Sequence, residues 1–74
     1  MNLETTYKVI ISQDGEIKKT FENEKNDFCA LRYLLQNQCQ STDYALRHGG
    51  WKVELINEQT GESDFWKPYT RINN

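Results

Sequence analysis

Two short turn signals, each between two runs of strand-forming residues, constrain this sequence most. They are Asp14-Gly15 and Thr60-Gly61, and a glycine-containing turn between two such runs is typical of a β-hairpin. The flanking runs, rich in β-branched and aromatic residues, span residues 5–12, 16–21, 51–58 and 62–67. The sequence therefore predicts one hairpin in each half of the chain.

The alternation of apolar residues sets the register expected for the first hairpin. A three-residue loop of Gln13, Asp14 and Gly15 pairs Ile11 with Ile17, whereas a two-residue loop pairs Ser12 with Ile17. We expect the first register because it gathers five apolar side chains on one face, and a shift of one residue would turn part of this set to the other face. That face would carry Tyr7, Val9, Ile11, Ile17 and Phe21.

The second hairpin is expected to follow the same rule. A loop of Gln59, Thr60 and Gly61 pairs Leu55 with Phe65. The apolar face would then carry Trp51, Val53, Leu55, Phe65 and Tyr69. The opposite face would carry Lys52, Glu54, Ile56, Glu58, Glu62, Asp64 and Trp66.

A helix is predicted between the hairpins. Phe28, Leu31 and Leu35 recur at helical spacing with Leu34 beside them, and this stripe is expected to face the core. The candidate caps are Asn23 or Asn26 at its start, Ser41 at a second start, and Gly49-Gly50 at the end. Whether residues 24–47 form one helix or a helix followed by a turn is left open by the pattern.

The order of elements is hairpin, helix, hairpin, which predicts an α+β fold of ββαββ type. A four-stranded sheet of the two hairpins, with one face under the helix, would bury both apolar faces in one core. The sheet could be β-grasp-like, with the two terminal strands parallel in its centre, or antiparallel throughout. Because 74 residues allow one small domain, we expect residues 1–74 to form it, with residues 69–74 as a candidate flexible tail.

Charge and hydropathy exclude several classes of protein. The net charge is −2 and the cations are spread evenly, so no segment is basic enough to neutralise a run of phosphates. Apolar runs are too short to span a membrane, and residues 1–4 lack the basic start and apolar core of a signal peptide. These features predict a cytosolic protein with no membrane partner.

The residues that could carry chemistry are few. Cys29, Cys39 and His48 are spaced too widely for a zinc site, in which close ligand pairs are usual. On one helix the two thiols would be about 15 Å apart, which is too far for a disulfide. A Cys–His pair would still lack an orienting group and an oxyanion hole. We therefore expect reduced thiols, no metal, no cofactor, no catalytic residue and no enzymatic activity.

The surface residue that the pattern singles out is Trp66. Its predicted neighbours on the open side of the sheet are Ile56 and Glu54, and Tyr69 and Arg71 in the tail would extend the patch. Exposed Trp, Tyr and Arg are typical of protein interfaces. A shift of one residue in register would instead turn Trp66 inward.

The predicted function is that of a small non-enzymatic module, an adaptor or inhibitor, that docks a larger protein through the second hairpin and the tail. A chain of this size suits a stand-alone accessory factor such as those that phages and mobile elements encode. A second copy of the chain is an alternative partner. A further alternative, which the net charge makes weaker, is a single-stranded nucleic-acid-binding module with Trp66 and Tyr69 as stacking platforms.

Overall fold

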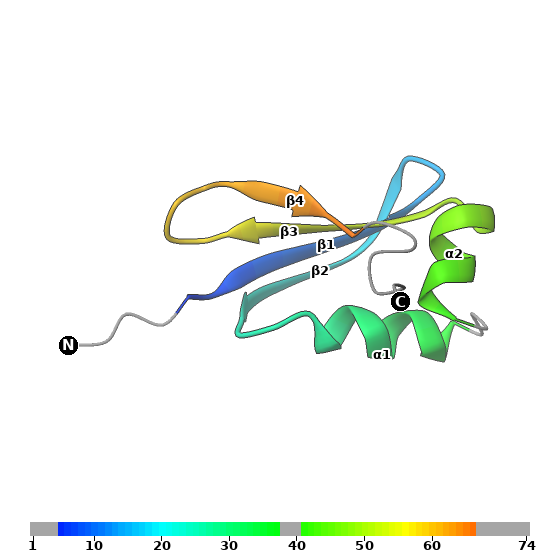
Figure 1. Cartoon of the computed structure of the whole chain (residues 1–74), viewed down its shortest axis with the longest axis horizontal. Helices are drawn as coiled ribbons and strands as arrows, with labels where there is room; N and C mark the ends of the chain where they lie inside the picture. Colours follow the sequence, from blue (N-terminus) through cyan, green and yellow to red (C-terminus); the bar gives the residue numbers. More distant parts are fainter. Residues whose placement is uncertain (1–4, 38–40, 67–74) are drawn as a thin grey trace, which may run out of the picture.

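The computed structural model describes residues 5–37 and 41–66 and shows an α+β fold, two hairpins with helices between them (Figure 1). The elements in chain order are β1 (Tyr7–Gln13), β2 (Glu16–Glu24), α1 (Phe28–Gln36), α2 (Thr42–His48), β3 (Trp51–Asn57) and β4 (Ser63–Phe65). The segment between the hairpins thus forms two helices rather than one. Residues 69–74, the predicted tail, lie outside the described residues.

The sheet is antiparallel throughout, with strand order β2-β1-β3-β4. The first strands of the two hairpins, β1 and β3, form the central pair, and Tyr7 lies opposite Asn57. Of the two predicted arrangements, the structure has the antiparallel one. A β-grasp-like sheet would need a parallel central pair.

The first hairpin turns over two residues. Asp14 (φ 52°) and Gly15 (φ 85°) both adopt the left-handed backbone of a type I′ turn, whose twist matches that of the strands. Ser12 therefore lies opposite Ile17, and the predicted three-residue loop is wrong at this end of the hairpin.

A bulge then changes the register of β2. Ile11 lies opposite Lys19, so Lys18 is an extra residue on β2, and Phe21 lies opposite Val9. The predicted pairing of Ile11 with Ile17 is therefore wrong. Ile17 is left 63% exposed instead of joining the core, whereas Phe21 packs against it.

A second irregularity lies at the far end of β2, where Asn23 has φ 61°. The Glu58 carboxylate holds it in place, because Oε2 accepts from the Asn23 backbone N–H at 3.1 Å and Oε1 accepts from the Thr6 hydroxyl at 2.6 Å. The Thr6 carbonyl accepts from the Glu58 N–H at 2.9 Å. The hydrogen bond from Thr6, followed by that from Asn23, lowers the pKa of Glu58 below its ordinary value of 4.5.

This lowered pKa predicts an acid-sensitive contribution to stability. The ionised Glu58 side chain stabilises the fold above its ordinary pKa, and the contribution is lost as the pH falls through the lower folded-state value. In urea unfolding measured from about pH 7 to about pH 3, Glu58→Gln should lose less stability on acidification than the wild type. Glu62→Gln, the same change in the same β3–β4 connection, should behave like the wild type. Parallel losses in all three proteins would contradict this role of Glu58.

The core lies between the helices and one face of the sheet (Figure 1). Its buried side chains are Val9, Ile11, Cys29, Ala30, Leu34, Ala45, Trp51 and Val53. In the described part of the chain no helix lies on the other face. The domain is thus two layers thick, and one side of its sheet is uncovered.

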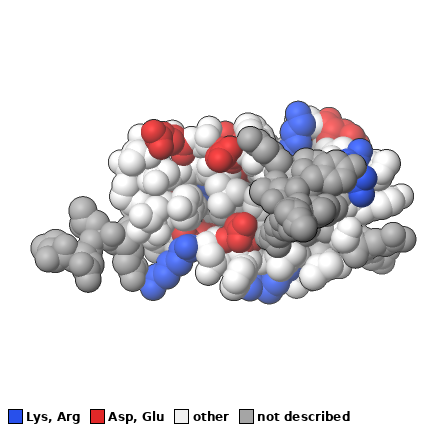
Figure 2. All heavy atoms as spheres, in the orientation of Figure 1, with Lys and Arg blue, Asp and Glu red and all other residues white. Residues whose placement is uncertain are grey.

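Charged side chains of both signs are scattered over the surface seen in Figure 2, and no large patch of one sign forms on the described residues in that view. This distribution agrees with the small net charge of −2.

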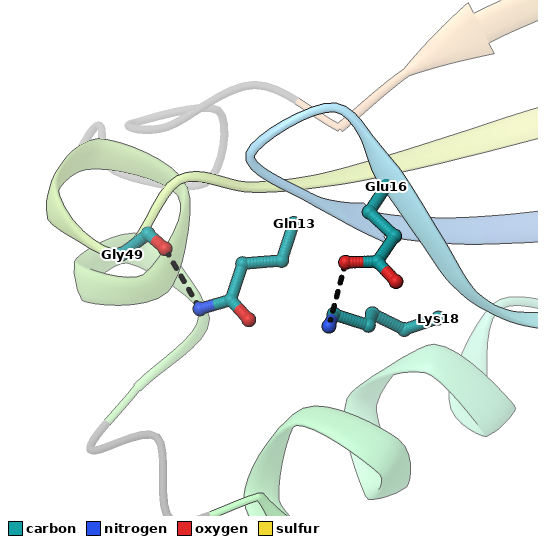
Figure 3. Close-up of polar contacts among 4 residues, drawn as sticks. All are labelled: Gln13, Glu16, Lys18 and Gly49. Atoms are coloured by element: carbon teal, nitrogen blue, oxygen red, sulfur yellow. Dashed lines mark hydrogen bonds and ion pairs between the residues drawn. The ribbon is translucent and has the colours of Figure 1, made fainter.

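The end of α2 is fixed against the first hairpin. The Ser41 hydroxyl caps α2 by accepting from the Tyr44 N–H at 3.1 Å, and Gly49 forms the C-cap, as the sequence predicts. Gln13 Nε2 donates to the Gly49 carbonyl at 3.1 Å, close to the Glu16–Lys18 ion pair of β2 (Figure 3). The Asp14 N–H donates to the Gly50 carbonyl at 2.9 Å. These contacts join the hairpin turn to the start of β3.

Candidate functional site

Trp66 does not lie where the sequence places it. Its backbone N–H donates to the Val53 carbonyl at 2.9 Å, and its indole Nε1–H donates to Asp27 Oδ2 at 2.9 Å. The half-buried ring packs against the core on the helix side of the sheet. The prediction that Trp66 shares an exposed face with Ile56 and Glu54 is therefore wrong.

The error arises in the loop of the second hairpin. The Asn57 N–H donates to the Glu62 carbonyl at 2.7 Å, so the loop contains residues 58–61 rather than three residues. Asn57 Oδ1 stabilises this longer loop by accepting from the N–H groups of Gln59 and Thr60. Phe65 consequently lies opposite Glu54 instead of Leu55, and every side chain of β4 points to the face opposite to the predicted one.

Phe65 replaces Trp66 on the uncovered side of the sheet, which we call the open face. Phe65 is 49% exposed, and Glu54 and Ile56 on β3 are partly buried beside it. The structure thus keeps two of the five predicted binding residues on this face. Tyr69 and Arg71 lie outside the described residues.

The rest of the open face follows from the pairing of the strands, because alternate residues point to opposite faces. Its apolar residues are Ile10, Ile17, Ile56 and Phe65. Its charged residues are Lys8, Glu22, Lys52 and Glu54, and Lys8 Nζ lies 3.9 Å from Glu22 Oε2.

A second apolar surface lies on α1 and is missing from the sequence-based site. Phe28, Leu31 and Leu35 are 57%, 36% and 53% exposed. We call these three residues the α1 stripe; the prediction that they face the core is wrong. Leu34, which the prediction also turns inward, does face the core, together with Cys29 and Ala30.

Size explains which face of α1 turns inward. Cys29 and Ala30 are small, so they let the helix lie close to the sheet, and Leu34 fills the remaining space. Tyr33 meets the Trp51 ring edge-on, with centroids 6.2 Å apart. The bond from Trp66 to Asp27, the N-cap of α1, fixes the start of the helix in this orientation. The N-cap is therefore Asp27 rather than either predicted residue, Asn23 or Asn26, although Asn26 Oδ1 accepts from the Phe28 N–H at 2.9 Å.

The candidate nucleophile is held in the core. Cys29 is free and 4% exposed, and burial, with a smaller contribution from Glu24, raises the pKa of its thiol. A protonated, buried thiol is a poor nucleophile. Cys39 lies outside the described residues. His48 is exposed, and the centroid of its ring lies 5.0 Å from that of Tyr44.

Other sites for chemistry are weak. Among residues 5–37 and 41–66, no three His, Cys, Asp or Glu side chains gather around a point where a metal ion could bind. A shallow pocket of about 290 Å³ is lined by Leu46, Trp51, Lys52, Phe65 and Trp66. Lys52 is the one charged residue in that lining, so the pocket offers no acid–base pair.

Comparisons with protein-family models, with curated proteins and with solved structures found no match. Neither of the two described helices has the length or apolar character needed to cross a lipid bilayer. The candidate functional site therefore rests on the two exposed apolar surfaces, the α1 stripe and the open face.

Proposed function

We propose that this chain is a non-enzymatic cytosolic protein-binding module, an adaptor or inhibitor, that inserts the α1 stripe into an apolar groove of a larger protein. The observation that carries the proposal is the orientation of α1, whose small side chains face the core while Phe28, Leu31 and Leu35 face solvent. Three large apolar side chains exposed together are costly for a domain with so small a core. A partner that covers them would remove this cost.

The spacing of the stripe favours a groove as the partner surface. Phe28, Leu31 and Leu35 stand at positions i, i+3 and i+7, which is the pattern of a helix that binds in a groove. The nine residues of α1 give a ridge about 13 Å long. Since a flat surface would touch only the crest of this ridge, a concave surface would bury it better.

The free energy gained by burying the α1 stripe is too small for micromolar binding, so the partner must make further contacts. Burying three half-exposed Phe and Leu side chains gains about 3 kcal/mol, whereas micromolar binding needs about 8 kcal/mol. Arg32 is exposed one residue after Leu31 and one turn from Phe28 and Leu35. A carboxylate on the rim of the groove would bond to this guanidinium and fix the register of the helix.

One of the two stacking platforms of the nucleic-acid alternative is held in the fold. Trp66 packs against the core and its N–H is bonded to Asp27, so this ring is not a free stacking platform. The described surface seen in Figure 2 also shows no large basic patch that would follow a phosphate backbone. No described feature favours this function over binding to a protein.

Affinity capture from a lysate of the source organism tests the proposal. The double variant Phe28→Glu/Leu35→Glu should lose a partner that the wild type captures, by about thirtyfold or more, which corresponds to the 2 kcal/mol of a hot spot. The matched control is Ile17→Glu, which places the same charge at the most exposed apolar side chain, away from α1. This control should capture the partner like the wild type.

The same experiment includes the outcomes that would contradict the proposal. Circular dichroism of the purified variants should show an unchanged fold, since both α1 substitutions are at exposed positions. A partner retained by the α1 variant, or capture abolished when the lysate is treated with nuclease, would argue against docking of a protein through the α1 stripe.

A further inference from the structure

We infer that the open face of the sheet binds a second copy of this chain, so that the protein forms a face-to-face dimer with one α1 stripe directed outward on each side. This inference does not depend on the proposed function, because it concerns the opposite surface of the domain and the purified chain alone. Three properties of the open face support it: its apolar side chains around Glu54, its balanced charge, and its size relative to the α1 stripe.

Apolar side chains surround Glu54 at the centre of the open face. Ile10 and Phe65 flank Glu54 on the neighbouring strands, and Ile56 is the next residue of β3 on the same face. The solvent face of an antiparallel sheet usually carries polar residues at such positions. Ile10, Ile56 and Phe65 thus form an apolar patch suited to contact with another apolar surface.

Charge favours a second copy over a strongly acidic or basic partner. The open face carries two lysines, Lys8 and Lys52, and two glutamates, Glu22 and Glu54, so its net charge is zero. Covering Glu54 among apolar side chains costs free energy unless a cation faces it. In a two-fold pair the same face occurs on both sides, so a lysine of one copy can face Glu54 of the other.

Size distinguishes the open face from the α1 stripe as a dimer surface. Three strands of seven to nine residues and the three-residue β4 give a plane of at most roughly 14 by 23 Å, about 300 Å² before side chains add relief. The ridge of α1, about 13 by 10 Å, is less than half as large. A standard interface buries about 800 Å² on each partner, so a pair formed through the open face would be a weak dimer, and the α1 stripe alone would bury still less.

The sheet edges favour contact through the face rather than through an added strand. Edge strand β2 has two irregularities and a left-handed residue at Asn23, and edge strand β4 has only three residues. Bulged and short edges offer few aligned hydrogen-bonding groups to another strand. A second copy would therefore stack on the open face, with the sheets about 10 Å apart.

Sedimentation and light scattering of the purified full chain test the inference. From about 1 to about 300 μM, the range over which weak dimers dissociate, we expect the mass to rise from that of the 8.8 kDa chain to twice that value. Phe65→Glu should raise the dissociation constant at least tenfold. Ser63→Arg, a bulky charge at an exposed position opposite Ile56, should do the same without altering any core side chain.

Leu35→Glu is the matched control, because it places an acid on an exposed apolar residue of the other side. This variant should dimerise like the wild type. A wild type that stays monomeric over the whole range would overturn the inference. So would a dimer that Leu35→Glu dissociates while Phe65→Glu and Ser63→Arg leave it intact.

Discussion

Replacing Trp66 by alanine is expected to lower the free energy of unfolding by about 3 kcal/mol, at the lower end of the range for loss of a large aromatic side chain. The ring is half-buried against the core, and its N–H donates a hydrogen bond to Asp27. This bond connects the end of the second hairpin to the start of α1. A domain of this size has a total stability of about 4–11 kcal/mol. The substitution should therefore remove a large part of the stability.

Urea unfolding followed by circular dichroism measures this loss. Trp66→Phe keeps an aromatic ring but loses the donor, so it should cost about 1 kcal/mol, the usual net contribution of one hydrogen bond. A double-mutant cycle with Asp27→Ala should show that most of the Trp66→Phe loss depends on Asp27. If Trp66→Ala unfolds at the wild-type urea concentration, the ring is not part of the core.

Substituting Gly50 by alanine is the second change expected to have a large effect, a loss of about 2–3 kcal/mol. Gly50 has φ +74°, a backbone conformation that costs an L-residue about 1–2 kcal/mol. A Cβ at this position would also overlap the carboxylate of Asp14. The Asp14 backbone is held by the bond from its N–H to the Gly50 carbonyl, so relief of this overlap requires the Asp14 carboxylate to rotate into another rotamer.

Gly61 provides the control for this substitution. It has φ +83°, but a Cβ there would meet no heavy atom within 4 Å. Gly61→Ala should therefore show the backbone cost alone, about 1 kcal/mol. The difference between the two variants in urea unfolding measures the contact between Asp14 and Gly50. Equal losses would mean that Asp14 accommodates the methyl group without cost.

The sequence predicts the elements of this fold better than their registers. The turn signals Asp14-Gly15 and Thr60-Gly61 identify both hairpins, and Ser41 and Gly49 mark the ends of α2. The registers fail where one extra residue enters. Lys18 is an extra residue in β2, and the Asn57 side chain stabilises a longer second loop. The alternation of apolar residues, which predicts the register, contains no sign of either feature.

The candidate site is harder to predict, because α1 has apolar residues on two faces. The pattern Phe28, Leu31, Leu35 and the set Cys29, Ala30, Leu34 both repeat at helical spacing, and bulk alone favours the first as the core face. The structure selects the second because small residues permit close packing on the sheet. The small residues Cys29 and Ala30, about one turn before Leu34, are the sequence signal for this contact face. If they face the sheet, the residues of the α1 stripe must face solvent.

The central position of β1 also affects how the chain folds. Its contacts with β2 join residues at most 17 positions apart, whereas its contacts with β3 reach from Tyr7 to Asn57. Closing that longer loop costs extra chain entropy and slows folding, because distant segments must meet before any contact forms. Formation of α1 and α2 shortens the connecting segment and brings the hairpins together. We expect the slow step to be the meeting of β1 and β3, after each hairpin has closed by itself.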